Sequence, residues 1–204
     1  MSLASTIKSN PGLKKFVHGL IVSKRRSEPR RWVKWFVNPF VHKRGKNSLV
    51  KFYARLDVFP FNDFRLGENS IIEDFAVINN GVGAVLVGNN VGIGLSNVII
   101  GPVILGNYVM LAQNIVISGL NHGFEDVTIP PRLQKVVTKQ ITINDNVWVG
   151  ANSSITAGIT IGKNAIIGAG SVVTKDIPEY CVAVGNPAKV IKKYNFETGS
   201  WERV

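Results

Sequence analysis

Residues 143–176 read INDNVWVGANSSITAGITIGKNAIIGAGSVVTKD, and an aliphatic residue returns there at every sixth position. Two earlier blocks show the same step, so that fifteen of fifteen such positions are aliphatic. They are Leu66, Ile72 and Ile78; Val87, Ile93, Ile99, Leu105, Leu111 and Ile117; and Ile143, Val149, Ile155, Ile161, Ile167 and Val173. Six is a multiple of the strand period of two but not of the helical 3.6, so a unit of strand and corner repeats with its aliphatic side chain always on one side.

The residues around these positions fit stacked coils. A small residue after the strand lets the backbone turn tightly, and glycine accepts the positive φ that some corners need. Glycine follows the aliphatic residue at positions 67, 88, 94, 106, 150, 162 and 168. A six-residue unit cannot bury its apolar side chain alone, so the units must stack into a solenoid. The alternative, a sandwich of short strands, predicts irregular turn spacing and no fixed phase.

The repeat is interrupted twice. The step from Ile78 to Val87 is nine residues, which indicates a three-residue insertion around residues 81–83. The step from Ile117 to Ile143 is 26 residues. We therefore expect residues 119–140 to form a loop that protrudes from a rigid solenoid, and functional residues concentrate on such loops.

Composition divides the chain of 204 residues into three predicted parts: a basic, aromatic-rich and partly helical arm (1–65), the repeat domain (66–185) and a C-terminal segment (186–204) with a short helix. The arm holds 15 Lys and Arg against three acids, whereas the rest has a net charge of −1. The sequence shows no secretory signal and no apolar run of membrane-spanning length. The single cysteine, Cys181, excludes an intramolecular disulfide, so we expect a soluble, cytoplasmic protein.

The stretch 143–176, followed by VGNPAKV at 184–190, resembles the hexapeptide-repeat acyltransferases, and most closely their maltose, galactoside and surface-polysaccharide O-acetyltransferases. The resemblance covers residues 66–193. It implies a mainly β fold, a left-handed parallel β-helix, and a homotrimer that binds acetyl-CoA in clefts between neighbouring prisms. It also implies transfer of an acetyl group to a sugar or glycan hydroxyl, in polysaccharide modification.

By motif, the catalytic histidine that the resemblance implies is His122. A neutral imidazole can remove the proton from a hydroxyl that attacks the thioester. Asp126, Glu125 or a backbone carbonyl could hold the other ring nitrogen, and Asn121 could orient the loop or touch the acceptor. Asn114 is expected at an inward corner, either structural or facing the substrate.

The resemblance also suggests a cleft for coenzyme A. Trp148 would line its acceptor and pantetheine end, or else cover the trimer contact. The pantetheine arm needs small neighbours and the phosphates need cations or donors. The predicted cofactor-binding residues are Gly150, Ala151, Gly168, Ala169, Thr174, Lys175, Lys189 and Lys192. No metal is expected, because an open zinc site takes about three ligands and two of the three histidines, His18 and His42, lie in the arm.

Residues 30–44 of the arm interleave aromatic and cationic side chains, with Trp32, Trp35 and Phe36 on one helical face and Pro39 ending that helix. This stretch could lie on an anionic membrane at its inner face. The favoured interpretation is that the aromatic rings pack on the prism while the cations face water. No nucleic-acid-binding motif is present. Two alternative functions stay open: N-acetylation of an amino-sugar nucleotide, and a non-catalytic binding scaffold.

Overall fold

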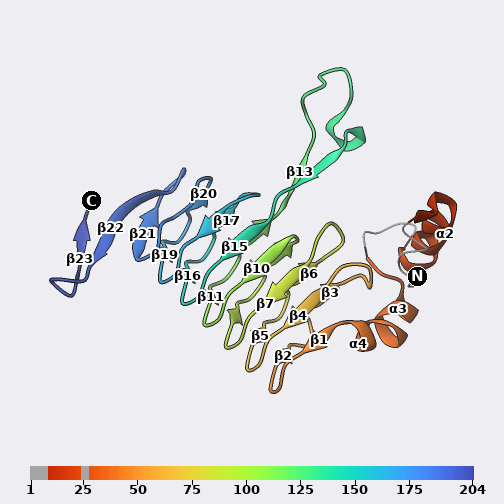
Figure 1. The fold of residues 1–204 in the computed structure, drawn as a ribbon, viewed down its shortest axis with the longest axis horizontal. Coiled ribbons are helices and arrows are strands. Elements are labelled where there is room, and N and C mark those ends of the chain that lie inside the picture. Colours follow the sequence, from red (N-terminus) through yellow and green to blue (C-terminus); the bar gives the residue numbers. More distant parts are fainter. Residues whose placement is uncertain (1–8, 24–27) are drawn as a thin grey trace.

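The computed structural model describes residues 9–23 and 28–204, and most of them form a parallel β-solenoid of six coils (Figure 1). Each coil gives one short strand to each of three sheets. Strands of unbroken neighbouring coils pair 18 residues apart, for example Val85 with Val103, which is three sides of six residues. The predicted mainly β solenoid of hexapeptide repeats is confirmed.

The three sheets form the three sides of the solenoid. The first sheet contains β1 (Lys43–Arg44), β4 (Phe64–Leu66), β7 (Val85–Val87), β10 (Val103–Leu105), β15 (Ile141–Ile143) and β18 (Thr160–Ile161). The second contains β2 (Leu49–Val50), β5 (Ile71–Ile72), β8 (Gly92–Ile93), β11 (Met110–Leu111), β16 (Trp148–Val149), β19 (Ile166–Ile167), β21 (Cys181–Val184), β22 (Lys189–Asn195) and β23 (Ser200–Arg203). The third contains β3 (Arg55–Asp57), β6 (Val77–Asn79), β9 (Val98–Ile100), β12 (Val116–Ser118), β17 (Ser154–Ile155) and β20 (Val172–Val173).

The core is the stack of inward side chains that the six-residue period predicts. All fifteen aliphatic positions are at most 5% exposed, and they belong to one continuous hydrophobic cluster. Burying a large aliphatic side chain contributes about 1.5–3 kcal/mol, so this stack supplies the main stabilisation of the solenoid.

Two residue types, glycine and asparagine, form the corners of the coils for different reasons. A Cβ on Gly67 would overlap the carbonyl oxygen of Gly88, and one on Gly150 would overlap the backbone of Ala169. These glycines are therefore required by the close approach of successive coils, and not by the positive φ that we expected. Asparagines provide seven of the eleven left-handed positions in the described residues that are not glycine, at 47, 69, 90, 114, 146, 152 and 164.

The solenoid begins at β1, one coil earlier than the predicted boundary at residue 66. Strands β1, β2 and β3 pair in parallel with β4, β5 and β6. Lys43 pairs with Arg65, a step of 22 residues, because the corner at 58–63 is longer than the others. That corner is held by the buried Asn80, which accepts from Phe59 N (2.6 Å) and donates to the carbonyl of Asn62 (2.7 Å).

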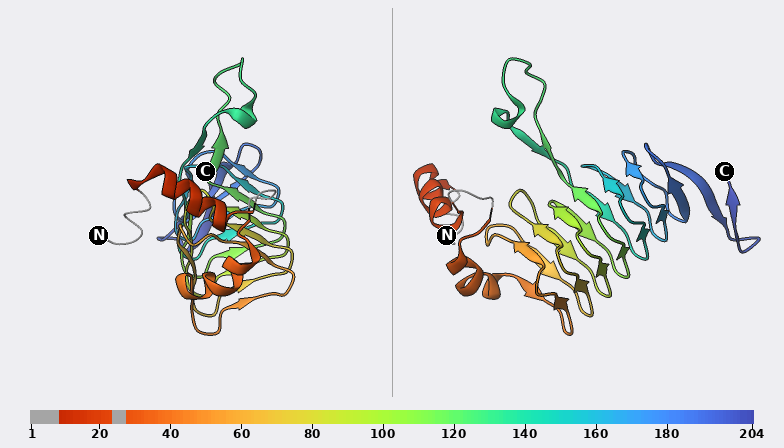
Figure 2. Two further views of the ribbon diagram at one scale, coloured as in Figure 1. Left: turned by 90° about the vertical axis from the view of Figure 1, so that its right-hand side faces the viewer. Right: turned by 180° about the vertical axis from the view of Figure 1, so that it is seen from behind.

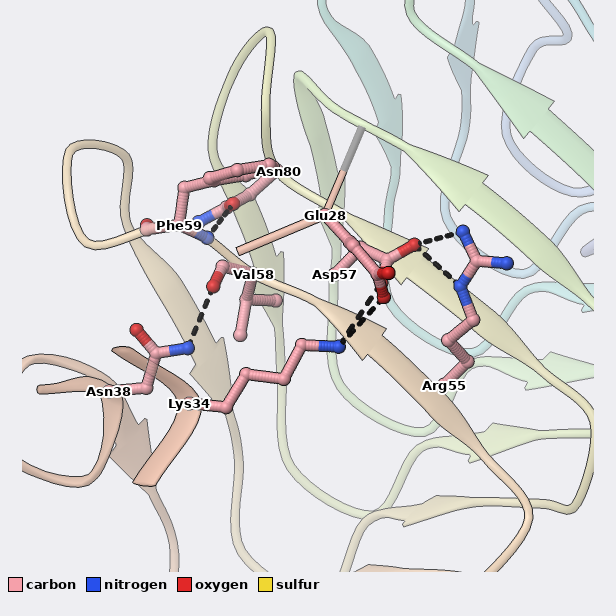
Figure 3. Close-up of polar contacts among 8 residues, drawn as sticks. All are labelled: Glu28, Lys34, Asn38, Arg55, Asp57, Val58, Phe59 and Asn80. Atoms are coloured by element: carbon pink, nitrogen blue, oxygen red, sulfur yellow. Dashed lines mark hydrogen bonds and ion pairs between the residues drawn. The ribbon is translucent and has the colours of Figure 1, made fainter. Parts of the chain in front are cut away.

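In the described part of the arm, three short helices lie at the N-terminal end of the solenoid: α2 (Pro11–Ile21), α3 (Arg31–Phe36) and α4 (Asn38–Val41) (Figures 1 and 2). Polar contacts fasten α3 and α4 to the first coil (Figure 3). The fully buried Asp57 accepts from Arg55 Nε (2.7 Å) and faces Lys34 Nζ (3.6 Å), while Asn38 Nδ2 donates to Val58 O (2.8 Å). Residues 1–8 and 24–27 of the predicted arm lie outside the described residues.

The aromatic residues of the arm do not pack on the prism as we favoured. Val33 is buried, but Trp35, Phe36 and Phe40 are 69%, 69% and 86% exposed. Helix α3 ends at Phe36, and α4 then begins with Pro39 in its first turn. Among the described residues, none of the helices combines the length and the apolarity needed to cross a membrane.

The predicted C-terminal helix is wrong. Residues 189–203 form strands β22 and β23, which extend the second sheet in antiparallel pairing beyond β21. Val190 packs against the end of the core, and the Tyr194 ring contacts those of Phe196 and Trp201. Val190 thus covers part of the last coil, and strand pairing with β21 decides the conformation of this segment.

Candidate active site

The 119–140 segment leaves the solenoid as a long hairpin, which projects well beyond the coils in every view (Figures 1 and 2). Its two strands, β13 (Leu120–His122) and β14 (Val136–Thr138), pair antiparallel, and a short 3₁₀ helix (Pro131–Leu133) lies in the tip. The hairpin follows β12 and precedes β15, so it emerges at the corner between the third and first sheets.

His122 ends β13, is exposed, and lies opposite Val136. Side chains alternate along a strand, so His122 shares a face of the ribbon with Leu120, while Asn121 points from the other face. The structure therefore does not bring the predicted pair Asn121 and His122 together. Just beyond, Gly123 N donates to the carbonyl of Lys135 (3.1 Å), and a Cβ on Gly123 would crowd that oxygen.

Asp126 belongs to the tip turn. Its Oδ1 accepts from the hydroxyl of Thr128 (2.6 Å) and from the amide of Thr128 (2.9 Å). These two bonds, the hydroxyl first, lower the pKa of Asp126. Within the described residues no hydrogen bond joins Asp126 to His122, and the carboxylate of Glu125 accepts from Phe124 N (2.9 Å). Glu125 and Asp126 therefore stabilise the tip turn, and neither carboxylate is hydrogen-bonded to the imidazole of His122 in the described residues.

Gln134, which no sequence pattern singled out, closes the tip. Its Nε2 donates to the carbonyls of Asp126 (2.8 Å) and Ile129 (2.7 Å). The tip nevertheless exposes Phe124, Val127 and Leu133, which are 73%, 96% and 75% accessible. Phe124 and Val127 also line a hollow of about 400 Å³. Exposed apolar patches of this kind mark surfaces that meet a partner.

A second hollow, of about 330 Å³, lies at the root of the hairpin. Leu120 contributes to it, so it opens on the face of the ribbon that carries His122. The rings of His18 and Phe61 stack across it with centroids 6.0 Å apart, which joins α2 to the long corner of the first coil. Its lining comprises His18, Val22, Phe59, Phe61, Asn79, Gly81, Val82, Ile100 and Leu120.

Trp148 lies elsewhere, on the outer face of the second sheet. Strand pairing stacks it above Met110 and below Ile166, and the same outward row continues through Val182 to Lys192. Trp148 is 46% exposed. Neighbouring strands are about 4.8 Å apart, so the three steps of this row from Trp148 to Lys192 span about 14 Å. Lys189 begins the same strand, opposite Val184.

The other predicted cofactor-binding residues occupy two different corners. Gly150–Ala151 and Gly168–Ala169 follow β16 and β19, and they stack on each other at the corner between the second and third sheets. Because coil packing requires Gly150, its small size does not by itself indicate room for a ligand. The exposed Thr174 and Lys175 follow β20 at the next corner. The structure does not gather all eight residues at one place.

Asn114 is at a corner, but it is exposed with φ 57° and does not face inward as expected. The buried amide of this region is that of Asn97, which the sequence interpretation missed. Its Oδ1 accepts from Ile115 N (2.6 Å) and its Nδ2 donates to Ala112 O (2.8 Å). The available signal was an asparagine four residues after Ile93, where other repeats have small or branched residues.

The two parts of the candidate active site therefore lie far apart within one chain. The His122 hairpin leaves the corner between the third and first sheets, whereas Trp148 and Lys192 lie on the second sheet, which is the side opposite that corner. Of the other histidines, His18 on α2 lines the hollow at the hairpin root, and His42 lies just before β1.

Comparison with known proteins gives consistent results. A family described as hexapeptide repeat of succinyl-transferase matches residues 140–175. The chain is 36% identical over 160 residues to a galactoside O-acetyltransferase of Lactococcus lactis, covering 76% of this chain and 75% of that protein. It spans about half the length of several other curated relatives that it matches.

Two solved structures share the fold. The polySia-specific acetyltransferase NeuO is 30% identical with a TM-score of 0.57, over 74% of this chain and 75% of that one. A variant of AntD, an N-acyltransferase from Bacillus cereus in complex with dTDP-4-amino-4,6-dideoxyglucose and coenzyme A, has a TM-score of 0.66 at 24% identity, over 76% of this chain and 86% of that one.

Proposed function

Because this chain belongs to the hexapeptide-repeat acyltransferases, in their sugar O-acetyltransferase branch, we propose that it transfers an acetyl group from acetyl-CoA to a sugar hydroxyl, with His122 as the general base. The observation that carries the proposal is the exposed His122 on the hairpin, on the same face of the ribbon as Leu120, which lines the hollow at the hairpin root. Polysaccharide or glycan modification in the cytoplasm is the role that fits such a transfer.

The active site in this proposal is shared between copies. The His122 hairpin and the Trp148 row lie on opposite sides of one prism, so a single chain cannot bring them to one substrate. Three copies arranged side by side, with each apolar hairpin tip reaching a neighbour, would place one chain's His122 beside the next chain's Trp148. A homotrimer would also cover the exposed Phe124, Val127 and Leu133.

The reaction needs one proton acceptor. The imidazole of His122 removes the proton from the acceptor hydroxyl as the oxygen attacks the thioester carbonyl carbon. The tetrahedral intermediate collapses with cleavage of the carbon–sulfur bond, and the imidazolium returns its proton to the departing thiolate. Backbone amides at the wall of the cleft would stabilise the oxyanion. The products are the acetyl ester and free coenzyme A.

Acetyl-CoA would lie along the outward row of the second sheet. The pantetheine arm is narrow and largely apolar, which matches Trp148, Ile166 and Val182. Its phosphates would then reach Lys192 and Lys189 at the end of the row. The coenzyme A bound to the structural neighbour AntD supports an acyl-CoA co-substrate of this kind. Thr174 and Lys175, at another corner, would have to act on a different neighbour.

The hollow at the hairpin root is the proposed place of the acceptor. Ligand pockets combine apolar and aromatic walls with a few polar groups, and here the rings of Phe59, Phe61 and His18 supply the walls. Among the described residues that line it there is no carboxylate, which favours a neutral hydroxyl over the ammonium group of an amino sugar. The relative from L. lactis is also named as an O-acetyltransferase.

The test is thiol release from acetyl-CoA in the presence of a panel of sugars and oligosaccharides. His122→Ala should lower kcat by a factor of about 10²–10⁴, the usual contribution of a general base. Lys135→Gln, on the same hairpin, is the matched control and should retain kcat. A His122→Ala protein with undiminished kcat would refute the general-base role, and wild-type protein inactive on every acceptor would count against the transfer itself.

We also propose that the aromatic surface of the arm (Trp32, Trp35, Phe36 and Phe40) contacts an anionic membrane from the cytoplasmic side. The rings are exposed, and the arm that carries them is strongly basic. This pairing of aromatic side chains with cations is typical of interfacial anchors. Wild-type protein should float with anionic vesicles at low salt, whereas Trp35→Ser with Phe40→Ser should not; wild-type protein that stays unbound would refute the contact.

A further inference from the structure

A cavity of about 780 Å³ lies beneath α3 and α4, at the open N-terminal end of the solenoid. The proposed acetyl transfer does not use it. Its walls combine apolar groups with cations and uncharged polar groups. The lining residues are Lys34, Asn38, Pro39, His42, Lys43, Arg44, Leu56, Val58 and Phe64.

Arg44 occupies an inward position of the first coil. It pairs in register with Leu66, and the residues above it in the first sheet are Val87, Leu105, Ile143 and Ile161. All five higher positions are aliphatic and buried. Side chains in register share a face, so the arginine is directed to the end of the prism axis, where the cavity lies.

The charge of the cavity is positive. Lys34 is neutralised by Glu28 (3.3 Å) and Asp57 (3.6 Å). Lys43 and Arg44, by contrast, form no ion pair within the described residues, and no carboxylate lines the wall. Asp63 lies near enough to raise the pKa of His42, but burial has the larger effect and lowers it.

Two of the polar wall residues have unused hydrogen-bonding atoms. Asn38 is 8% exposed, and its Nδ2 is committed to Val58 O. Its Oδ1 has no partner in the described part of the chain, and neither ring nitrogen of His42 has one. A buried polar atom without a partner costs about 1–3 kcal/mol, so pairing these three atoms with polar groups from outside the chain would recover part of that cost.

We propose that this cavity binds a polyol phosphate. The phosphate would take charge-assisted hydrogen bonds from Arg44, and Lys43, which pairs with Arg65 on the opposite face of the sheet, would add to the positive potential. Hydroxyl groups would donate to Asn38 Oδ1 and exchange hydrogen bonds with His42. A soluble sugar phosphate and the glycerophosphate headgroup of a membrane lipid share this chemistry. The helices α3 and α4 that form the wall also carry the aromatic surface proposed to contact the membrane, so the cavity lies close to lipid headgroups as well as to soluble phosphates.

The binding test is isothermal titration of the full chain with glycerol 3-phosphate, and with glycerol as the ligand that lacks the phosphate. Wild-type protein should bind glycerol 3-phosphate saturably and glycerol not at all. Arg44→Gln should weaken binding by about tenfold or more, the equivalent of one charge-assisted hydrogen bond. Lys46→Gln, which removes the same charge from the same segment outside the cavity, should change affinity by less than about twofold.

A purely structural role for Arg44, as a polar residue that ends the core, predicts no specific contribution of Arg44 to phosphate binding. In that case wild-type protein shows no saturable binding, or Arg44→Gln and Lys46→Gln weaken binding equally, and the proposal is overturned. If Arg44→Gln does not fold, the imidazole NMR signals of His42 in wild-type protein decide. They should shift saturably with glycerol 3-phosphate, and an unchanged signal would overturn the proposal.

A second arm of the test identifies the source. Vesicles of phosphatidylcholine with phosphatidylglycerol are titrated against wild-type protein and Arg44→Gln. Weaker vesicle binding by the variant, with competition by glycerol 3-phosphate, would assign the site to a lipid headgroup. Binding of glycerol 3-phosphate together with identical vesicle binding by both proteins would assign it to a soluble phosphate. Acetyl transfer is measured separately and does not bear on either result.

Discussion

Replacing Asn97 by leucine tests how two neighbouring coils of the solenoid are joined. The side chain is fully buried and bridges two coils, accepting from Ile115 N and donating to Ala112 O. Leucine has a similar volume, so it leaves little cavity but removes both bonds. Each buried group left unpaired costs about 1–3 kcal/mol, so Asn97→Leu should lose about 2–6 kcal/mol of unfolding free energy. That is a large part of the 5–15 kcal/mol typical of a domain.

Urea denaturation followed by circular dichroism measures this loss. Asn114→Gly is the matched control, because Asn114 is an exposed corner asparagine with φ 57°, a conformation that glycine adopts freely. The control should change the unfolding free energy by less than about 1 kcal/mol. An Asn97→Leu protein as stable as the control would show that the buried amide is not what joins these coils.

Three further outcomes are expected. Lys192→Gln should raise the KM for acetyl-CoA about tenfold with little change in kcat, as measured by initial rates; an unchanged KM would remove Lys192 from the cofactor path. Thr128→Val should raise the pKa of Asp126 in a carboxyl ¹³C NMR titration, because the hydroxyl bond lowers it. A carboxyl group whose pKa is lowered in the folded state stabilises that state at neutral pH, and the contribution is lost as the pH falls through this lowered pKa. Acid should therefore destabilise the hairpin tip of the wild-type protein more than that of the variant. Cys181 is 2% exposed and burial raises the pKa of its thiol, so a thiol-reactive disulfide reagent should modify native protein far more slowly than protein in denaturant.

The core of the fold was predictable because one physical rule repeats. A six-residue period keeps every sixth side chain inward, and positions from Leu66 to Val173 obey it. The first coil was not predicted, because the long corner at 58–63 shifts the phase of the six-residue repeat and because Arg44 occupies a position where the repeat predicts an aliphatic residue. The C-terminal helix was wrong because Val190, Tyr194 and Trp201 find their partners only in the finished structure.

The candidate site was predictable in part. The break in the repeat located the hairpin, and the single histidine in it stood out. The turn role of Asp126 and the closing bonds of Gln134 depend on the path of the tip, which no periodicity describes. The separation of His122 from Trp148 needs the order of strands in three sheets, and so it emerges only from the topology.

Mixed assemblies test most directly the claim that the active site is shared between chains. His122→Ala removes the base, and Trp148→Glu places a carboxylate in the path proposed for the cofactor, so each variant alone should be inactive while still trimeric. Equal amounts refolded together should form random trimers in which about a quarter of the interfaces pair an intact His122 with an intact Trp148. The mixture should therefore recover about a quarter of the wild-type activity. A mixture as inactive as its two parents would contradict a site built from two copies.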